Sequence, residues 1–276
     1  MSKRNWLWTI NRRLRKLGFE ISRYPCREFI LRTSEELSRI TSQINQGDLL
    51  SKSDFGDVLQ GHAFILKSGS MSHSQLSQDA WIIGLMKGRK GGHYLEIGAY
   101  DPYEYSNSAV LREKYDWTGF HVDPSPTSHS KFNMAGLDNW FIKAGIGKET
   151  GLGRLIGDGA FAQLVAVSEC SNSSSTAPTC PDDLVAIMTP DELLRRVGEV
   201  DYLSLDIEGG EIDVLRNWPF ELCKPYVMTI EHNHRETDRE EITQICTARG
   251  YRQVLAAATD FESWFVLDSE IGPTAL

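Results

Sequence analysis

The sequence predicts an α/β fold in which helices cover both faces of a mostly parallel central sheet. From about residue 75 onward, short apolar runs alternate with segments of helical pattern. This alternation is typical of βαβ units, whose parallel strands are buried on both sides. The length of 276 residues and the hydrophobic content of 41% suit one large domain of this class with an added segment.

The polar residues at the ends of the expected strands are the candidate site, because parallel sheets bind ligands beyond the carboxyl ends of their strands. We expect strands at 93–98, 119–123, 140–144, 202–207, 226–231 and 264–267, with a further candidate at 252–255. We expect helices between several of them, at 108–115, 190–197, 211–217 and 239–249.

Residues 1–74 form a separate N-terminal arm in this interpretation, and residues 75–276 form the domain. The spacing of Trp6, Ile10 and Leu14 predicts a helix near the start of the arm. Two interpretations of this helix stay open. It lies in the headgroup layer of a membrane, or it packs on the body of the protein. The remainder of the arm, over 47–74, is expected to be a connecting segment.

Charge is distributed unevenly along the chain. Residues 1–24 hold seven basic side chains and one acidic one, so the net charge of -9 leaves the rest of the chain at -15. A body this acidic is a poor candidate for binding nucleic acid. The sequence lacks an apolar run long enough to span a bilayer and the pattern of a secretory signal. We therefore expect a cytoplasmic protein, with residues 1–24 available for peripheral contact at the inner membrane face.

A serine-rich stretch at 168–180 is expected to be a mobile loop that could close over the acceptor. Cys170 and Cys180 flank it, so a disulfide that closes the loop is one alternative and two free thiols are the other. The five cysteines are an odd number and widely scattered, which suits a reducing compartment. Cys223 and Cys246 are expected to fill the core.

The first two strand ends indicate a nucleotide-type ligand. Glu96 and Gly98 close the first strand, where the glycine lets the backbone approach a ligand. Asp123 closes the second strand and is placed to bind the two hydroxyls of an adenosine ribose, or alternatively to cap the segment that follows. The glycines of a Rossmann dehydrogenase fingerprint and the phosphate-binding loop are missing, which disfavours NAD and other pyrophosphate ligands.

The fourth and fifth strand ends carry the candidate catalytic residues. Asp206 and Glu208 would project to one side of an extended chain, and Glu231 and His232 would face the same cleft. Neighbouring acids raise each other's pKa unless a cation lies between them. The set therefore indicates a general base, a Mg²⁺ or Mn²⁺ site at Asp206, Glu231 and His232, or both. The alternatives are a cap for the helix at 211–217 and, for His232, a purely structural role.

Six short segments, taken in order, resemble the FkbM-type methyltransferase family. The resemblance covers residues 75 to about 268 and leaves the arm outside it. It implies the Rossmann-like sheet of class I methyltransferases and S-adenosylmethionine as methyl donor. The segments are Ser77-Gln78-Asp79, 94–99, Ser106-Asn107-Ser108, Trp117-Thr118-Gly119, 123–126 and 201–211.

The resemblance also implies roles for individual residues. Pro102 and Ser108 depart from the usual family residues without removing the donor site. The donor would be held by Glu96, Gly98, Ala99, Tyr100, Asn107 and Asp123. Catalysis is assigned to Asp206, Glu208 and His232 on the pattern of polar residues at the strand ends described above.

The predicted function is S-adenosylmethionine-dependent O-methylation of a sugar hydroxyl or glycan precursor, as part of polysaccharide biosynthesis. The expected partner is thus a small-molecule or glycan acceptor, and no nucleic acid. The alternative is an inactive relative that binds the donor and serves as an adaptor in a glycan-assembly or membrane-associated complex.

Overall fold

The structure is a computed structural model that describes residues 52–156, 163–166, 184–256, 259 and 261–268. The predicted basic helix and the serine-rich loop with Cys170 and Cys180 lie outside the described residues. Two compact units make up the chain. The first contains residues up to Gly91, Tyr105–Trp117 and Val254–Asp260, and the second contains the rest. Among the described residues, no helix has the length and apolarity needed to cross a membrane.

The described part of the first unit contains three helices: α3 (Lys52–Lys67), α4 (Gln78–Leu85) and α5 (Ala109–Tyr115). The sequence predicted a connecting segment where α3 lies, and that prediction was wrong. Glycine accounts for the close packing of α3 and α4. A Cβ on Gly61 would stand 1.6 Å from the Ala80 carbonyl oxygen, and one on Gly84 would stand 1.7 Å from the Asp57 carbonyl oxygen.

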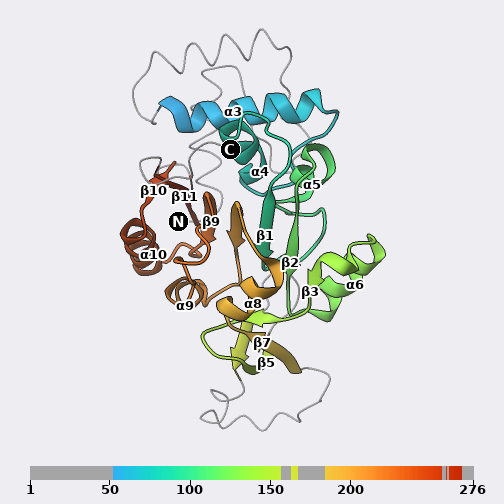
Figure 1. The fold of residues 1–276 in the computed structure, drawn as a ribbon, viewed down its shortest axis with the longest axis vertical. Helices are drawn as coiled ribbons and strands as arrows, with labels where there is room; N and C mark the ends of the chain where they lie inside the picture. The colour runs from blue at the N-terminus through green and yellow to red at the C-terminus, as the bar shows by residue number, and fades with distance from the viewer. Residues whose placement is uncertain (1–51, 157–162, 167–183, 257–258, 260, 269–276) are drawn as a thin grey trace. The chain divides into compact units, whose positions relative to one another are not determined.

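The second unit is built on a seven-stranded sheet with the order β10-β11-β9-β8-β1-β2-β3, shown in Figure 1. The five strands from β9 to β3 run parallel, and β11 pairs antiparallel with β9. The strands are β1 (His93–Ile97), β2 (Thr118–Val122), β3 (Phe141–Ile142), β8 (Tyr202–Leu205), β9 (Val227–Glu231), β10 (Tyr251–Val254) and β11 (Glu262–Leu267).

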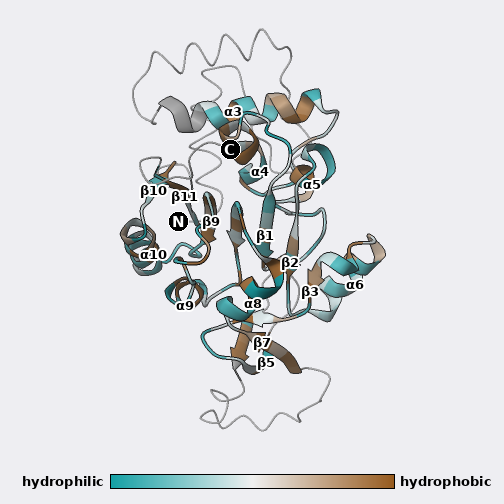
Figure 2. Cartoon of the chain, in the orientation of Figure 1, coloured by the Kyte–Doolittle hydropathy of each residue, from teal (hydrophilic) through white to brown (hydrophobic). Residues whose placement is uncertain are grey.

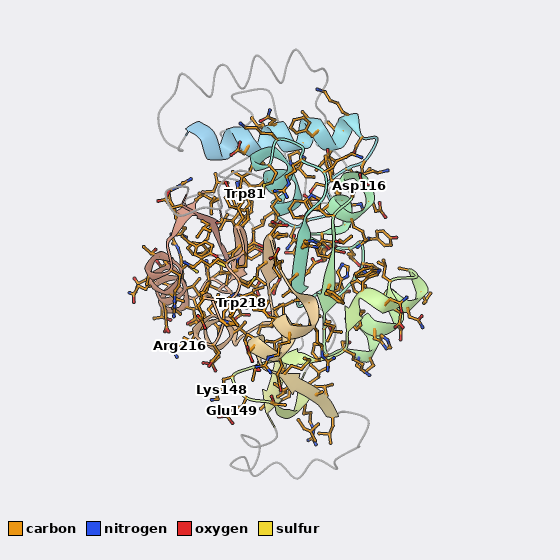
Figure 3. The ribbon with its side chains drawn as sticks, in the orientation of Figure 1. Trp81, Asp116, Lys148, Glu149, Arg216 and Trp218 are labelled. Carbon is orange, nitrogen blue, oxygen red and sulfur yellow. The ribbon has the colours of Figure 1, made fainter. Side chains whose placement is uncertain are left out.

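Helices cover both faces of this sheet, as predicted. One face packs its apolar side chains on α8 (Pro190–Val197), α9 (Glu211–Arg216) and α10 (Glu236–Ala248). The α10 ribbon is largely teal in Figure 2 because most of its residues are hydrophilic, and its buried residues are Ile242 and Cys246. In Figure 3, Trp218 lies among these packed side chains and Arg216 lies at the periphery.

On the other face, Phe132 of α6 (Pro126–Met134) packs against His121 with ring centroids 4.6 Å apart. The helix begins sharply because Ser125 caps it and Pro126 occupies its first turn. A short 3₁₀ helix, η1 (Asp138–Trp140), leads from this region into β3.

A second, four-stranded sheet was not expected from the sequence. Its order is β4-β7-β5-β6, with β5 antiparallel to both of its neighbours. It is inserted between β3 and α8 of the main sheet. Its strands are β4 (Gly145–Ile146), β5 (Gly151–Ile156), β6 (Gln163–Ala166) and β7 (Leu184–Met188).

Candidate active site

The order of strands in the main sheet creates a crevice between β1 and β8. The chain passes from β1 to β2 and β3 on one side, and from β8 to β9 on the other, so β1 and β8 form the switch point. The Asp206 N–H donates to the Ile97 carbonyl oxygen at 3.0 Å, which joins the two strand ends.

Gly98 makes this junction possible. Its φ is +87°, and a Cβ at this position would stand 1.5 Å from the Asp206 carbonyl oxygen. No side chain fits there, so the glycine is needed for both its conformation and the space. The sequence predicted a close approach of the backbone at Gly98, and the close neighbour is the β8 strand end.

A cavity of about 470 Å³ lies at the carboxyl ends of β1, β2 and β8. Its volume is in the range typical of small-molecule sites. Most of its lining comes from four segments of the second unit: Ile97, Gly98 and Tyr100 at the end of β1, Val122–Ser125 at the end of β2, Ala144–Leu152 around β4, and Asp206–Gly210 after β8. Leu155, Leu164, Ile187 and Asp213 complete it. Lys148 and Glu149, labelled in Figure 3, belong to the connection between β4 and β5.

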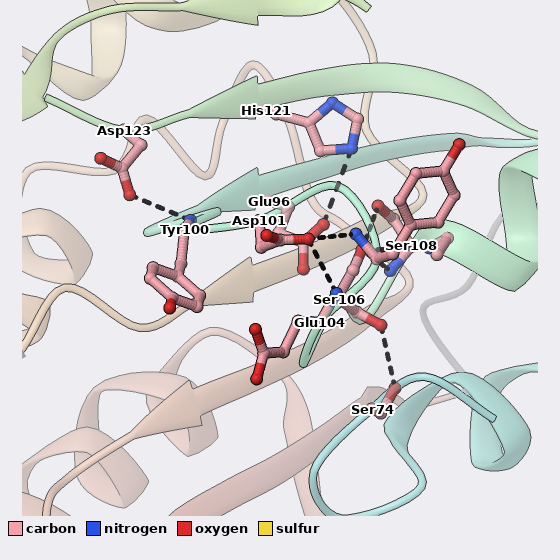
Figure 4. Close-up of polar contacts among 11 residues, drawn as sticks. Ser74, Glu96, Tyr100, Asp101, Glu104, Ser106, Ser108, His121 and Asp123 are labelled. Carbon is pink, nitrogen blue, oxygen red and sulfur yellow. Dashed lines mark hydrogen bonds and ion pairs between the residues drawn. The ribbon is translucent and has the colours of Figure 1, made fainter. Parts of the chain in front are cut away.

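Asp123 is fixed at one end of this cavity by two backbone donors. Its carboxylate accepts from the Tyr100 N–H at 3.0 Å, drawn in Figure 4, and from the Ser125 N–H at 2.7 Å. The side chain is buried, and burial raises the pKa of Asp123, although these hydrogen bonds oppose the shift. Asp123 thus orders the turn before α6, as the capping alternative predicted, and it also lines the cavity.

Glu96 lies elsewhere. It is buried, and one of its carboxylate oxygens lies 3.7 Å from His121 Nε2 (Figure 4). Glu96 and Ala99 are not among the residues that line the cavity, and Asn107 belongs to the first unit. Of the six residues that the resemblance implied for the donor, the structure places Gly98, Tyr100 and Asp123 on the cavity.

Three carboxylates gather at the other end of the cavity. Asp206, Glu208 and Glu231 offer oxygens that all lie within 4.8 Å of one another. Asp206 and Glu208 line the cavity, and Glu231 stands behind them at the end of β9. His232 is not part of this cluster. The charges that act on its ring are those of Arg239 and His234, and burial lowers its pKa.

The surroundings of Glu231 favour the protonated form of its side chain. Burial raises the pKa of Glu231 far above its ordinary value, and the charge of Asp206 and a hydrogen bond to that residue add to the shift. Two unit charges 4 Å apart repel by about 4 kcal/mol at the effective dielectric constant near a protein surface. One proton shared between the two carboxyl groups removes most of this repulsion.

The turn after β8 holds Glu208 at the cavity. Glu208, Gly209 and Gly210 all have positive φ, at 59°, 119° and 115°. Glu211 ties this turn together, because its Oε1 accepts from the N–H groups of Ile207 and Gly209. The capping interpretation therefore applies to Glu211, which leaves Asp206 and Glu208 directed to the cavity.

Sequence reasoning missed Asn233 and the apolar wall of the cavity. The Asn233 amide donates to both Glu208 and Glu231. Asn233 follows β9 in a turn with a φ of 50°, so the alternation of side chains along the strand could not have placed it beside Glu231. The apolar wall comes from the unexpected second sheet, through Leu155, Leu164 and Ile187.

Comparison with known proteins identifies the family. A sequence model described as the methyltransferase FkbM domain matches residues 96–253, which is more than half of the chain. No curated protein matches the chain. Many solved structures are similar to it at low identity, and the three described next have TM-scores below 0.5.

A putative O-methyltransferase from Klebsiella pneumoniae shares 10% identity over 97% of this chain and 99% of its own, with a TM-score of 0.38. The O-methyltransferase from Bacillus cereus, in complex with SAH, shares 12% identity over 96% of this chain and 99% of its own, also with a TM-score of 0.38. The O-methyltransferase TomG from Streptomyces achromogenes shares 14% identity over 97% of this chain and 98% of its own, with a TM-score of 0.35. The match to the family model confirms the resemblance seen in the sequence, and the chain belongs to the FkbM methyltransferase family.

Proposed function

We propose that this protein transfers a methyl group from S-adenosylmethionine to a hydroxyl group of a sugar or glycan precursor. One observation carries the proposal. A single cavity joins the residues suited to the donor, Gly98 and Asp123, to the carboxylates suited to accept a proton, Asp206 and Glu208.

The residues at the donor end fit this cofactor. The Asp123 carboxylate accepts from the N–H groups of Tyr100 and Ser125 and from the Ser128 side chain, which leaves one of its four lone pairs for a ribose hydroxyl. Carboxylates supply most of the charge around the cavity, which favours a ligand that carries the positive charge of a sulfonium. When bound, S-adenosylmethionine supplies an electrophilic methyl group.

Glu208 is the proton acceptor in this proposal, with Asp206 beside it. Both line the cavity, so a hydroxyl group bound there lies within their reach. Since His232 lies outside both the carboxylate cluster and the cavity lining, we assign it no catalytic role. The chain's contribution is to hold the hydroxyl group, take its proton and align it with the methyl group.

The acceptor class is supported by the chemistry of the lining. Asp206, Glu208, Asp213 and Thr150 offer oxygens that accept hydrogen bonds from the hydroxyl groups of a sugar, and the Lys148 ammonium can donate to its ring oxygens. A product of this kind would enter polysaccharide biosynthesis. The basic residues 1–24 would bring the enzyme to the inner membrane face.

The first test is calorimetric binding of S-adenosylmethionine and S-adenosylhomocysteine, with and without Mg²⁺. We expect both to bind with micromolar affinity. We expect Asp123→Ala to weaken binding at least ~10-fold, or about 1.4 kcal/mol. Asp138→Ala is the matched control, because this carboxylate is exposed and pairs with His129 away from the cavity lining. Absence of binding under all conditions would contradict the proposal.

Turnover separates the enzyme from the adaptor. Methyl-labelled donor is incubated with a panel of sugars, sugar phosphates and nucleotide sugars, and Asp206→Asn and Glu208→Gln are compared with the wild type. We expect both variants to retain donor binding and to lose at least ~100-fold in kcat, as for loss of a general base. Donor binding without transfer to any acceptor would favour the adaptor, and full turnover by both variants would overturn the catalytic assignment.

A further inference from the structure

The side chain of Asn233 connects two carboxylates that come from different parts of the chain. Its amide nitrogen donates to Glu231 Oε2 at 2.9 Å and to Glu208 Oε2 at 3.2 Å. An amide nitrogen has two hydrogens, so one is available for each carboxylate. Asn233 thus makes a neutral cross-link between the turn after β8 and the segment after β9.

The position of this amide matters because of what surrounds it. Asp206, Glu208 and Glu231 form a cluster that could hold a metal ion. A divalent cation would need lone pairs of these carboxylates, at distances of about 2.0–2.6 Å. Oε2 of Glu208 and Oε2 of Glu231 both accept from the amide, so a cation that used these two oxygens would compete with the amide for them.

The backbone indicates that both ends of the cross-link need support. Glu208 has a φ of 59° and Asn233 has a φ of 50°, in the left-handed region. A residue other than glycine pays roughly 1–3 kcal/mol for such a conformation, which persists only where neighbouring contacts maintain it. The hydrogen bond between these two side chains is such a contact.

We propose that Asn233 is a positioning residue that takes the place of a cation in the carboxylate cluster. Its amide donates the hydrogen bonds that hold Glu208 at the cavity. These hydrogen bonds take the place of the bonds that the carboxylates would otherwise make to a metal ion, so the cluster needs no metal ion. The role of Glu208 in proton transfer rests on the proposed function. The exclusion of a cation does not, and it can be measured without donor or acceptor.

Titration with Mn²⁺, followed by the electron paramagnetic resonance signal of the free ion, tests this proposal. We expect no saturable binding to the wild type below ~1 mM, which is the affinity range of weak carboxylate sites. Asn233→Asp replaces the donor with a fourth carboxylate and should tighten binding at least ~10-fold. Asn233→Ala, which removes the amide without adding charge, should show a smaller gain. Asn217→Asp is the control, because this exposed amide donates to a backbone carbonyl oxygen at the end of α9.

Two results would overturn the proposal: wild-type protein that binds Mn²⁺ as tightly as Asn233→Asp, or a folded Asn233→Asp protein with no gain over the wild type. Circular dichroism reports folding, and the wild-type titration remains decisive if the variant does not fold. Once an acceptor is known, Asn233→Ala should lower kcat at least ~10-fold with little change in KM for S-adenosylmethionine. A change confined to KM would contradict the positioning role. Failure of donor binding would instead count against the proposed function.

Discussion

The two faces of the seven-stranded sheet differ in how many buried polar groups they carry. The face toward α8, α9 and α10 is largely apolar, with side chains such as Leu95, Leu203 and Phe265 in one continuous core. The opposite face carries buried polar groups on the same strands, one residue along from the apolar ones. They are Glu96, His121, Tyr202, Ser204, Thr229, Glu231 and Glu262.

Within this one sheet, the apolar face therefore contributes mainly to stability, and the polar face carries the groups that lead into the active site. The side chains of the apolar face stabilise the fold because their surface is removed from water, and this stabilisation does not depend on a specific partner. Each group on the polar face needs a partner of its own, because an unpaired buried polar group costs free energy. The Tyr202 hydroxyl lies 2.8 Å from Thr229 Oγ1, and the Trp264 indole donates to Glu262 at 2.7 Å. Glu231 belongs to this face and continues it into the active site.

Substitution of Gly98 should have the largest effect, because this residue lies where both faces end at the cavity. We expect Gly98→Ala to cost more than ~4 kcal/mol or to prevent folding, since the new Cβ would overlap the Asp206 carbonyl group. Urea unfolding measures the cost. Gly151→Ala is the control, because a Cβ there would meet nothing within 4 Å. Equal stability of the two variants would show that the β1 and β8 ends are not locked together.

Removal of a large side chain from the apolar face should come next. Phe265 is fully buried, and Phe265→Ala should lower the free energy of unfolding by ~3–5 kcal/mol through lost burial and the cavity left behind. Leu222 is 74% exposed, so Leu222→Ala should change stability by less than ~0.5 kcal/mol. A loss below ~1 kcal/mol for Phe265→Ala would contradict a close-packed core on this face.

The sequence predicted the apolar face well. The short runs expected at 93–98, 202–207 and 226–231 correspond to β1, β8 and β9 within two residues at each end. Buried parallel strands are short and continuously apolar, so composition alone marks them. The acidic residues at the strand ends were predicted for the same reason, because the end of an apolar run in the sequence marks the end of the strand.

What could not be predicted depends on contacts between distant segments. The segment 47–74 is rich in serine, glycine and aspartate, and glycines such as Gly61 have low helix propensity, so α3 was taken for a connecting segment. The close packing of Gly61 on α4 is a contact that the local sequence does not reveal. The pairing of β5 with β7 joins strands far apart in sequence, and local periodicity does not reveal such pairing. Glu96 was assigned to the donor because it lies beside Gly98, but its place in the strand turns it toward His121.

The pH dependence of stability tests the polar face where it meets the site. The raised pKa of Glu231 means that the folded protein keeps a proton that the unfolded chain releases above its ordinary pKa of 4.5. The free energy of unfolding should therefore fall as pH rises above this value, by at most ~1.4 kcal/mol per unit. Glu231→Gln should flatten this dependence and be more stable than the wild type at pH 8. Denaturant unfolding from pH 5 to pH 9 measures it, with the exposed Glu236→Gln as control. A wild-type curve that rises with pH would mean that Glu231 is ionised in the fold.

The smallest expected effect belongs to a single hydrogen bond on the polar face. Thr229→Val keeps the volume but removes the hydroxyl beside Tyr202, and it should cost ~1 kcal/mol because the buried phenol loses one partner. Tyr202→Phe removes the other half of the pair. The double variant measures their coupling, which should be about 0.5–1.5 kcal/mol in urea unfolding. A coupling near zero would mean that Ser204, whose side chain also interacts with the Tyr202 hydroxyl, satisfies it alone. The polar face would then tolerate the loss of one hydrogen-bond partner. Only the charged residues near the cavity would need a specific partner for each group.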